Sequence, residues 1–250
     1  MILISNDDGF DAVGICSLAD MVRDLGTVLV CAPDSARSGY SRAFSATTPL
    51  FLKQRHNMGD IEVWSCNGTP VDCVKLAVSE LCHGRTPDLV LGGINHGDNS
   101  TVNNHYSGTM GVAIEGCLKG IPSIAFSNCD YDTTASQSHL AHYVRLIVQR
   151  VLAQGLPHGV CLNVNFPNRQ TFEGIRACRM AYGQWVQEIA PCRHPYGAAY
   201  YWMVGHYQNE ESQAQDTDQW ALSQGYVAIT PTTIDVTAYG MIDTINSWNL

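Results

Sequence analysis

Short apolar segments alternate with segments of helical periodicity over most of this chain, and this alternation constrains its fold more than any other feature. Residues 2–4, Ile-Leu-Ile, predict a buried strand. Apolar residues then recur at helical spacing over 15–25, Gly26 supplies a helix-ending position, and 27–32 predicts a second strand. This β-α-β opening is typical of an α/β protein with a largely parallel sheet.

The same alternation continues to residue 166 and resumes near the end of the chain. Thr69 and Pro70 suit the N-cap and the first turn of a helix. The other elements that we expect are strands at 49–53, 61–65, 88–94, 121–127, 160–166 and 226–230 and helices at 70–81, 107–118, 134–153 and 217–224. We divide the chain into a body that carries the site, residues 1–170, and a C-terminal region, residues 171–250.

Seven of the 22 aromatic residues fall between 182 and 207, a far higher density than elsewhere in the chain. They are Tyr182, Trp185, Tyr196, Tyr200, Tyr201, Trp202 and Tyr207. An extended hairpin arm that buries its rings against a partner subunit would explain the cluster, because Tyr and Trp favour interfaces. A small local core is the alternative.

Length and composition exclude several classes of protein. The 250 residues with 45% apolar content suffice for one α/β domain and an appended arm, and a net charge of −9 argues against binding long nucleic acid. The N-terminus does not resemble a secretion signal, and no run approaches the roughly 20 apolar residues of a membrane span. The ten cysteines form no CxxC pair, so we expect buried free thiols in a cytoplasmic protein with no membrane partner.

Four polar clusters interrupt the apolar pattern. Those at 6–9, 37–41 and 92–95 lie where strands should end, and the cluster at 106–109 opens a helix. The carboxyl ends of parallel strands share one edge of a sheet, where ligands commonly bind. We therefore expect these clusters to meet there.

Asp7 and Asp8 are adjacent carboxylates, and Gly9 allows the chain to turn so that both can face one site. Two like charges so close are unfavourable unless a cation or a shared proton compensates them. With Ser38 and Asn95 nearby, the ligand set would be all oxygen, which suits Mg²⁺ or Mn²⁺ better than zinc. The alternative is an ordinary polar turn without a ligand.

A phosphate could be held at the amino end of the helix that Ser107, Gly108 and Thr109 open, because the N–H groups and the helix dipole there favour anions. Ordinary N-capping explains the same hydroxyls. Asn67 could lie at the rim of the crevice. A basic patch near Ser38 could also contact phosphate or simply be solvated; it comprises Arg37, Arg42, Lys53 and Arg55.

Other common site motifs are absent from the sequence. No HxH or HExxH pattern occurs, and we treat His96 and His105 as incidental loop residues rather than metal ligands. The sequence contains no GxGxxG, GxxxxGK[ST] or GxSxG motif. It therefore lacks the usual motifs of a dinucleotide site, a phosphate-binding P-loop and a serine hydrolase.

The polar clusters belong to longer blocks whose order covers nearly the whole chain. The blocks are ILISNDDG, APDSARSGYS, NGTPVDCV, GGIN followed by YSGTMGVAIEG, LNVNFP and GYVAITPT. In this order they resemble the SurE family of survival-protein nucleotidases. The resemblance implies a Rossmann-like, mostly parallel sheet with helices on both faces and C-terminal hairpins that assemble a homodimer or homotetramer. It also implies metal-dependent removal of phosphate from nucleoside 5′- and 3′-monophosphates, with short polyphosphate as a further substrate.

The resemblance also implies roles for individual residues. Asp7, Asp8, Ser38 and Asn95 would hold one divalent cation per subunit, Mg²⁺ or Mn²⁺. Phosphate would be bound by Ser107, Gly108 and Thr109, with Asn6, Gly39 and Asn67 as further candidates. Asp8, or Asp7 in the reverse geometry, would orient or deprotonate the attacking water, and Ser107 would stabilise charge on the phosphate oxygens.

Two positions depart from the family pattern. Gly92 stands where a serine is usual, which loses a hydroxyl beside Asn95, and Tyr40 replaces a smaller residue, so it could narrow the site or stack on a base. Two other functions stay open from the residues: a nucleoside hydrolase that uses Ca²⁺, and a nucleotide-binding or scaffold protein whose site has decayed.

Overall fold

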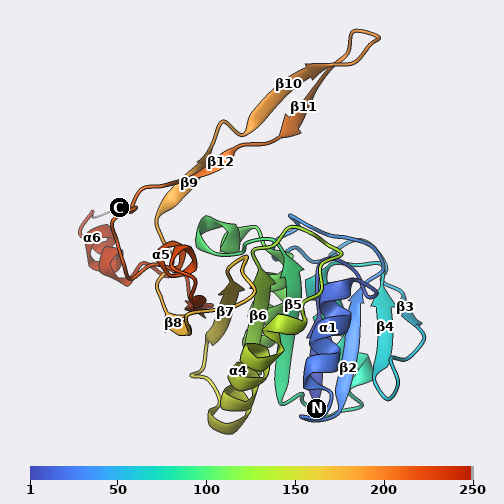
Figure 1. Cartoon of the computed structure of the whole chain (residues 1–250). Helices are drawn as coiled ribbons and strands as arrows, with labels where there is room; N and C mark the ends of the chain where they lie inside the picture. Colours follow the sequence, from blue (N-terminus) through green and yellow to red (C-terminus); the bar gives the residue numbers. More distant parts are fainter. Residues whose placement is uncertain (249–250) are drawn as a thin grey trace.

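The apolar runs of the sequence form the strands of one nine-stranded sheet in the computed structural model, which describes residues 1–248 (Figure 1). The strand order is β3-β4-β2-β1-β5-β6-β7-β13-β8. Its strands are β1 (Ile2–Ser5), β2 (Val28–Pro33), β3 (Leu52–Gln54), β4 (Glu62–Cys66), β5 (Leu89–His96), β6 (Ser123–Asn128), β7 (Val160–Phe166), β8 (Ile175–Ala177) and β13 (Val227–Thr233). Most neighbours pair in parallel, whereas β3–β4 and β7–β13 are antiparallel. The expected α/β fold is confirmed.

Helices cover both faces of this sheet because successive side chains of a buried strand point in opposite directions. In β1, Ile2 and Ile4 join the apolar cluster under helices α1 and α4, whereas Leu3 joins the cluster under α2 and α3. The α-helices are α1 (Val13–Val22), α2 (Pro70–Leu76), α3 (Gly108–Leu118), α4 (Ala141–Gln154), α5 (Asp218–Ser223) and α6 (Ile242–Asn246). Short helical turns of other types are η1 (Ala77–Leu81), η2 (Thr101–His105), η3 (Ser138–Leu140) and η4 (Tyr239–Met241).

Three predicted boundaries were wrong, and side-chain hydrogen bonds explain two of them. The helix expected over 15–25 ends at Val22, with Arg23 rather than Gly26 at its C-cap. The helix expected from 134 begins as η3 and α4 only at 138, because Asp130 and Asp132 accept hydrogen bonds from backbone N–H groups two residues further on and shape turns instead. The strand expected at 49–53 shrinks to β3, since Asn67 binds the backbone of Phe51 and Pro49.

The aromatic segment forms an extended arm that leaves the body at the edge of the sheet where the parallel strands end (Figure 1). The arm consists of β9 (Gly183–Val186), β10 (Ile189–Arg193), β11 (Ala199–Met203) and β12 (His206–Asn209), with β10 paired to β11 and β9 paired to β12, both antiparallel. Tyr196 is 94% exposed and Trp202 is 62% exposed. A local core around these rings, the alternative interpretation, is therefore wrong for this chain.

All ten cysteines are free thiols. Seven of them are buried, namely Cys31, Cys66, Cys73, Cys82, Cys117, Cys161 and Cys178, and the other three are half-buried. The expectation of free thiols is confirmed, although three are less deeply buried than expected. Across residues 1–248, the structure contains no helix with the length and apolarity needed to cross a bilayer.

Helix α1 crosses β5 so closely that Gly14 leaves no space for a side chain. A Cβ atom at this position would lie 1.9 Å from the carbonyl oxygen of Ile94. We expect Gly14→Ala to lower the free energy of unfolding by at least about 1–3 kcal/mol, because the backbone of β5 must shift to make room for the added methyl group. Urea unfolding measures this loss.

Gly26 offers a matched control, since a Cβ atom there would meet no heavy atom within 4 Å. Gly26→Ala should change the free energy of unfolding by no more than about 0.5 kcal/mol. Equal stability of the two variants would contradict the close approach of α1 to β5.

Candidate active site

Parallel pairing of β2, β1 and β5 brings together the loops that follow these strands. The N–H of Arg37 donates to the carbonyl oxygen of Asp7 at 2.7 Å and so joins the loop after β2 to the loop after β1. The N–H of Ser41 donates to the carbonyl oxygen of Tyr106 at 3.1 Å and joins the same loop to the residues before α3. The end of β5 approaches through its last residue, His96, whose Nδ1 lies 3.6 Å from Asp8 Oδ2. The four polar clusters therefore meet at one edge of the sheet.

Asn6 shapes the turn that presents the two aspartates. Its side chain is fully buried, Nδ2 donates to the carbonyl oxygen of Gly9 at 2.9 Å, and Oδ1 accepts from the N–H of Gly9 at 3.2 Å. Gly9 has a φ of +118°, which L side chains rarely adopt. The amide of Asn6 is thus engaged within the turn, and its contact with phosphate stays a prediction.

Asp7 is a buried carboxylate held by the start of α3. Only 4% of the residue is exposed, and Oδ1 accepts a hydrogen bond from the hydroxyl of Thr109. The pKa of Asp7 is raised to about 6, mainly by burial and also by the neighbouring Asp8 charge, although hydrogen bonds from Thr109 and the backbone oppose the rise. Ionised Asp7 is therefore energetically unfavourable unless a cation compensates it.

Asp8 carries a buried oxygen that lacks a hydrogen-bond partner. Within residues 1–248, Oδ2 of Asp8 makes no hydrogen bond. His96 Nδ1 lies 3.6 Å from this oxygen. The other ring nitrogen of His96, Nε2, lies 2.9 Å from Nε2 of the buried Gln137. An unpartnered buried carboxylate oxygen is the kind of atom that a metal ion would satisfy.

Asn95 and Ser38 complete the candidate ligand set. Nδ2 of Asn95 donates to the carbonyl oxygen of Gly97 at 2.9 Å, which fixes the amide and leaves Oδ1 available. Ser38 is exposed and directly follows Arg37, whose N–H binds Asp7. In the described part of the chain, no group of three or more His, Cys, Asp or Glu residues could hold a metal ion. The candidate set contains only two such residues, Asp7 and Asp8, because its other two ligands are neutral oxygens. Its chemistry fits a hard divalent cation.

The amino end of α3 faces the aspartates. Ser107 is the N-cap, and its Oγ accepts from the N–H of Met110 at 3.0 Å. Thr109 is fully buried with its hydroxyl on Asp7, so this side chain supports the carboxylate rather than pointing outward. The N–H of Met110 is engaged by Ser107 and the backbone of Gly108 hydrogen-bonds Asp7, so what α3 can offer an anion is the rest of its first turn and its dipole.

The two departures from the family pattern have different structural settings. A side chain at Gly92 would bring its Cβ within 2.6 Å of the carbonyl oxygen of Thr109, so the close packing of α3 on β5 requires the glycine. Tyr40 is 51% exposed on the loop after β2, next to Gly39, which is itself exposed with a φ of +77°. This loop carries Ser38 and borders the site.

Other predicted contributors are engaged elsewhere. Both polar side-chain atoms of Asn67 bind the 49–51 segment, and Arg37 donates to the carbonyl oxygens of Asn67 and Gly68. Arg55 donates to Ser65 Oγ at 2.8 Å and lies over the Phe10 ring. The structure therefore gives two members of the basic patch, Arg37 and Arg55, partners within the protein.

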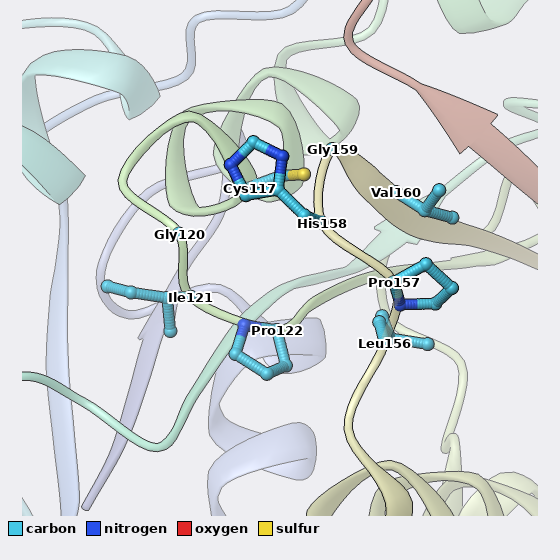
Figure 2. Close-up of a pocket in the computed structure, with 9 residues that line it drawn as sticks. All are labelled: Cys117, Gly120, Ile121, Pro122, Leu156, Pro157, His158, Gly159 and Val160. Carbon is cyan, nitrogen blue, oxygen red and sulfur yellow. The ribbon is translucent and has the colours of Figure 1, made fainter.

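A separate cavity of about 170 Å³ lies between the end of α3 and the loop before β7 (Figure 2). Its walls include Cys117, Pro122 and His158. Residues 120–122 precede β6, and residues 156–160 lead into the start of β7, so this cavity is at the amino ends of the strands, on the edge opposite the aspartates. It takes no part in the candidate site.

Sequence reasoning missed His96 and Gln137. His96 directly follows Asn95, so its position beside a predicted ligand was a usable signal. Gln137 was beyond prediction, because it reaches His96 across 41 residues of sequence from a segment that was expected to be helical.

Comparison with known proteins gives one consistent family. The family profile described as "Survival protein SurE" matches residues 2–187. A protein of Phocaeicola vulgatus named "5'-nucleotidase SurE" is 51% identical over 250 residues, covering 100% of this chain and 97% of its own length. A protein of Bacteroides fragilis with the same name is 49% identical, covering 100% of this chain and 98% of its own length.

A solved structure agrees with the fold as well as with the sequence. The crystal structure of the SurE protein from Aquifex aeolicus has a TM-score of 0.86 and 35% sequence identity, and the match covers 100% of this chain and 99% of that one. The shared fold, the profile match and identities near 50% over the whole length all lead to one conclusion: this chain belongs to the survival protein SurE family.

Proposed function

We propose that this protein is a metal-dependent phosphomonoesterase that hydrolyses nucleoside 5′-monophosphates to a nucleoside and inorganic phosphate. The names of the relatives from Phocaeicola vulgatus and Bacteroides fragilis support the reaction class. The observation that carries the proposal is the pair Asp7 and Asp8, one with a raised pKa and the other with an unpartnered oxygen, facing the amino end of α3. Nucleoside 3′-monophosphates and short polyphosphate are further substrates that we include on the family resemblance.

One divalent cation per subunit, Mg²⁺ or Mn²⁺, would be held by Asp7, Asp8, Ser38 and Asn95. When bound there, such a cation polarises a phosphate oxygen and lowers the pKa of a bound water. The two carboxylates balance the 2+ charge of the cation, and the two neutral ligands add no further negative charge. The site therefore does not repel an anionic substrate.

The protein's own groups then position the reactants. The dipole at the amino end of α3, and the first-turn N–H groups that Ser107 and Asp7 do not engage, bind the phosphate oxygens and stabilise the charge that grows on them. Asp8 orients the attacking water and accepts its proton, while Thr109 and the backbone hold Asp7 in place. The new bond joins water oxygen to phosphorus, the bond to the ribose oxygen breaks, and that oxygen leaves with a proton.

Product analysis tests this proposal against its two rivals. Incubation with AMP and Mn²⁺ or Mg²⁺ should release inorganic phosphate and adenosine, and EDTA should abolish the release. Free adenine with Ca²⁺ would instead identify a nucleoside hydrolase. Binding of AMP without any product, across several metals, would identify a nucleotide-binding protein.

We further propose that the arm, within residues 171–250, assembles the protein into a homodimer or homotetramer in the cytoplasm. Its exposed rings would be buried in such an assembly, and ten free thiols suit a reducing compartment. Light scattering on the full chain should give a mass of two or four subunits. Replacing residues 190–202 by a short turn should lower that mass, and an intact protein that is monomeric would contradict the proposal.

A further inference from the structure

His96 is a buried imidazole whose two ring nitrogens face different loops. Its side chain is only 4% exposed, and Nδ1 lies 3.6 Å from Oδ2 of Asp8. Nε2 lies 2.9 Å from Nε2 of Gln137, in the loop after β6. Helix α1 borders a third side of the ring, because a Cβ atom at Gly14 would lie 3.4 Å from Cε1 of His96. Three segments of the chain therefore hold the ring in one orientation.

The two polar neighbours determine which ring nitrogen carries the proton when the imidazole is neutral. A bare Nδ1 would set its lone pair against the carboxylate of Asp8, whereas an N–H at this position is attracted to it. Nε2 must then accept a hydrogen bond, and the amide of Gln137 supplies the donor. With its amide reversed, Gln137 would instead require the proton on Nε2 and leave Nδ1 bare beside Asp8.

Gln137 is not the residue that stability alone would favour at this position. It is 1% exposed, and within residues 1–248 its Oε1 is buried without a hydrogen-bond partner. A buried amide oxygen of this kind destabilises a folded protein, and an apolar side chain of similar length would avoid the loss. The amide is better explained by the hydrogen bond that it donates to His96.

We propose that His96 is a positioning residue for Asp8 and that Gln137 sets its tautomer. The Nδ1–H of His96 attracts Oδ2 of Asp8 into one orientation, and the amide of Gln137 keeps the proton on that nitrogen. Each carboxylate oxygen has two lone pairs, so this attraction leaves Asp8 able to bind a cation as well. The inference rests on the proposed phosphomonoesterase function, in which Asp8 binds the cation and accepts a proton from water.

Nuclear magnetic resonance of the metal-free protein reads the tautomer directly. Long-range ¹H–¹⁵N correlation spectra of histidine-labelled protein at about pH 8, where an ordinary imidazole is neutral, distinguish a proton on Nδ1 from one on Nε2. The signal of His96 is the one that disappears in His96→Asn. We expect the Nδ1–H form in the unmodified protein. A proton on Nε2, or on both nitrogens, would overturn the proposal.

Gln137→Met keeps the length of the side chain but cannot donate to the ring. We expect a larger share of the Nε2–H form of His96 in this variant. An unchanged tautomer would overturn the role of Gln137. The urea midpoint of the metal-free variant should stay close to that of the unmodified protein, because the substitution removes an unpartnered buried oxygen together with the hydrogen bond.

Calorimetric binding of Mn²⁺ measures the effect on Asp8 without any turnover. His96→Leu should weaken Mn²⁺ binding about tenfold, the size expected when a metal ligand loses a supporting contact. His96→Asn should recover most of the affinity, because the Asn amide can place an N–H near the position of Nδ1. Equal weakening in both variants would overturn the proposal, since it would show a loss of packing rather than of a donor.

His142 and Gln154 supply matched controls, because both are exposed on α4. His142→Leu and Gln154→Met should leave Mn²⁺ binding and the tautomer of His96 unchanged. The inference and the proposed function fail in different ways. If the binding pattern held but AMP released no phosphate, the positioning of Asp8 would stand and the reaction would be wrong. If His96→Leu hydrolysed AMP and bound Mn²⁺ as the unmodified protein does, the reaction would stand and the positioning role would be wrong.

Discussion

Asp8→Asn is expected to lower kcat/KM for AMP about a thousandfold at saturating metal, because it removes a charge from the site without changing side-chain size. The fold should tolerate the change, since Oδ2 of Asp8 makes no hydrogen bond within residues 1–248. Phosphate release under steady-state conditions measures the effect. Circular dichroism melting should give an unchanged transition within about 2 °C.

Asp11 supplies a matched control. It is an exposed aspartate three residues further along the same loop, with no assigned role in the site. Asp11→Asn should retain the activity of the unmodified protein. Full activity in Asp8→Asn would remove this carboxylate from the proposed mechanism.

Asp7 should make the metal-free protein less stable at neutral pH than in mild acid. Its pKa is about 6 in the folded chain against an ordinary value of 3.8, so the folded state binds more protons than the unfolded state between these pH values. The free energy of unfolding therefore falls as pH rises from about 4 to about 6, and the loss persists above 6. Two pKa units correspond to about 3 kcal/mol.

Asp7→Asn should remove this part of the pH dependence. In EDTA, the fall in unfolding free energy between pH 4 and pH 7 should be about 3 kcal/mol smaller in Asp7→Asn than in the unmodified protein. Denaturant unfolding at both pH values measures it, and Asp11→Asn should match the unmodified protein. An identical pH dependence in Asp7→Asn and the unmodified protein would contradict the burial of a charged Asp7.

Parallel strand order made much of the site predictable. The runs at 2–4, 27–32 and 88–94 are apolar enough to be buried strands, and parallel strands must end at the same edge, so loops far apart in sequence had to meet. The helix cap at Ser107 also followed from local sequence, because capping depends on one hydroxyl and a nearby N–H.

Contacts between side chains distant in sequence were not predictable. Thr109 was expected to face phosphate, but it donates to Asp7, 102 residues away in sequence. The bond between Gln137 and His96 depends on a loop whose turns replaced an expected helix. The periodicity of the sequence does not predict such pairs, since they depend on how the helices, strands and loops pack against one another.

The central claim is that the edge formed by β1, β2 and β5 holds a divalent cation beside the amino end of α3. Anomalous diffraction from crystals soaked with Mn²⁺ and a non-hydrolysable AMP analogue tests it most directly. The account predicts one manganese peak per subunit, coordinated by Asp7, Asp8, Ser38 and Asn95, with the phosphate between it and Ser107. A manganese ion bound elsewhere, in crystals of a protein that hydrolyses AMP, would contradict the account.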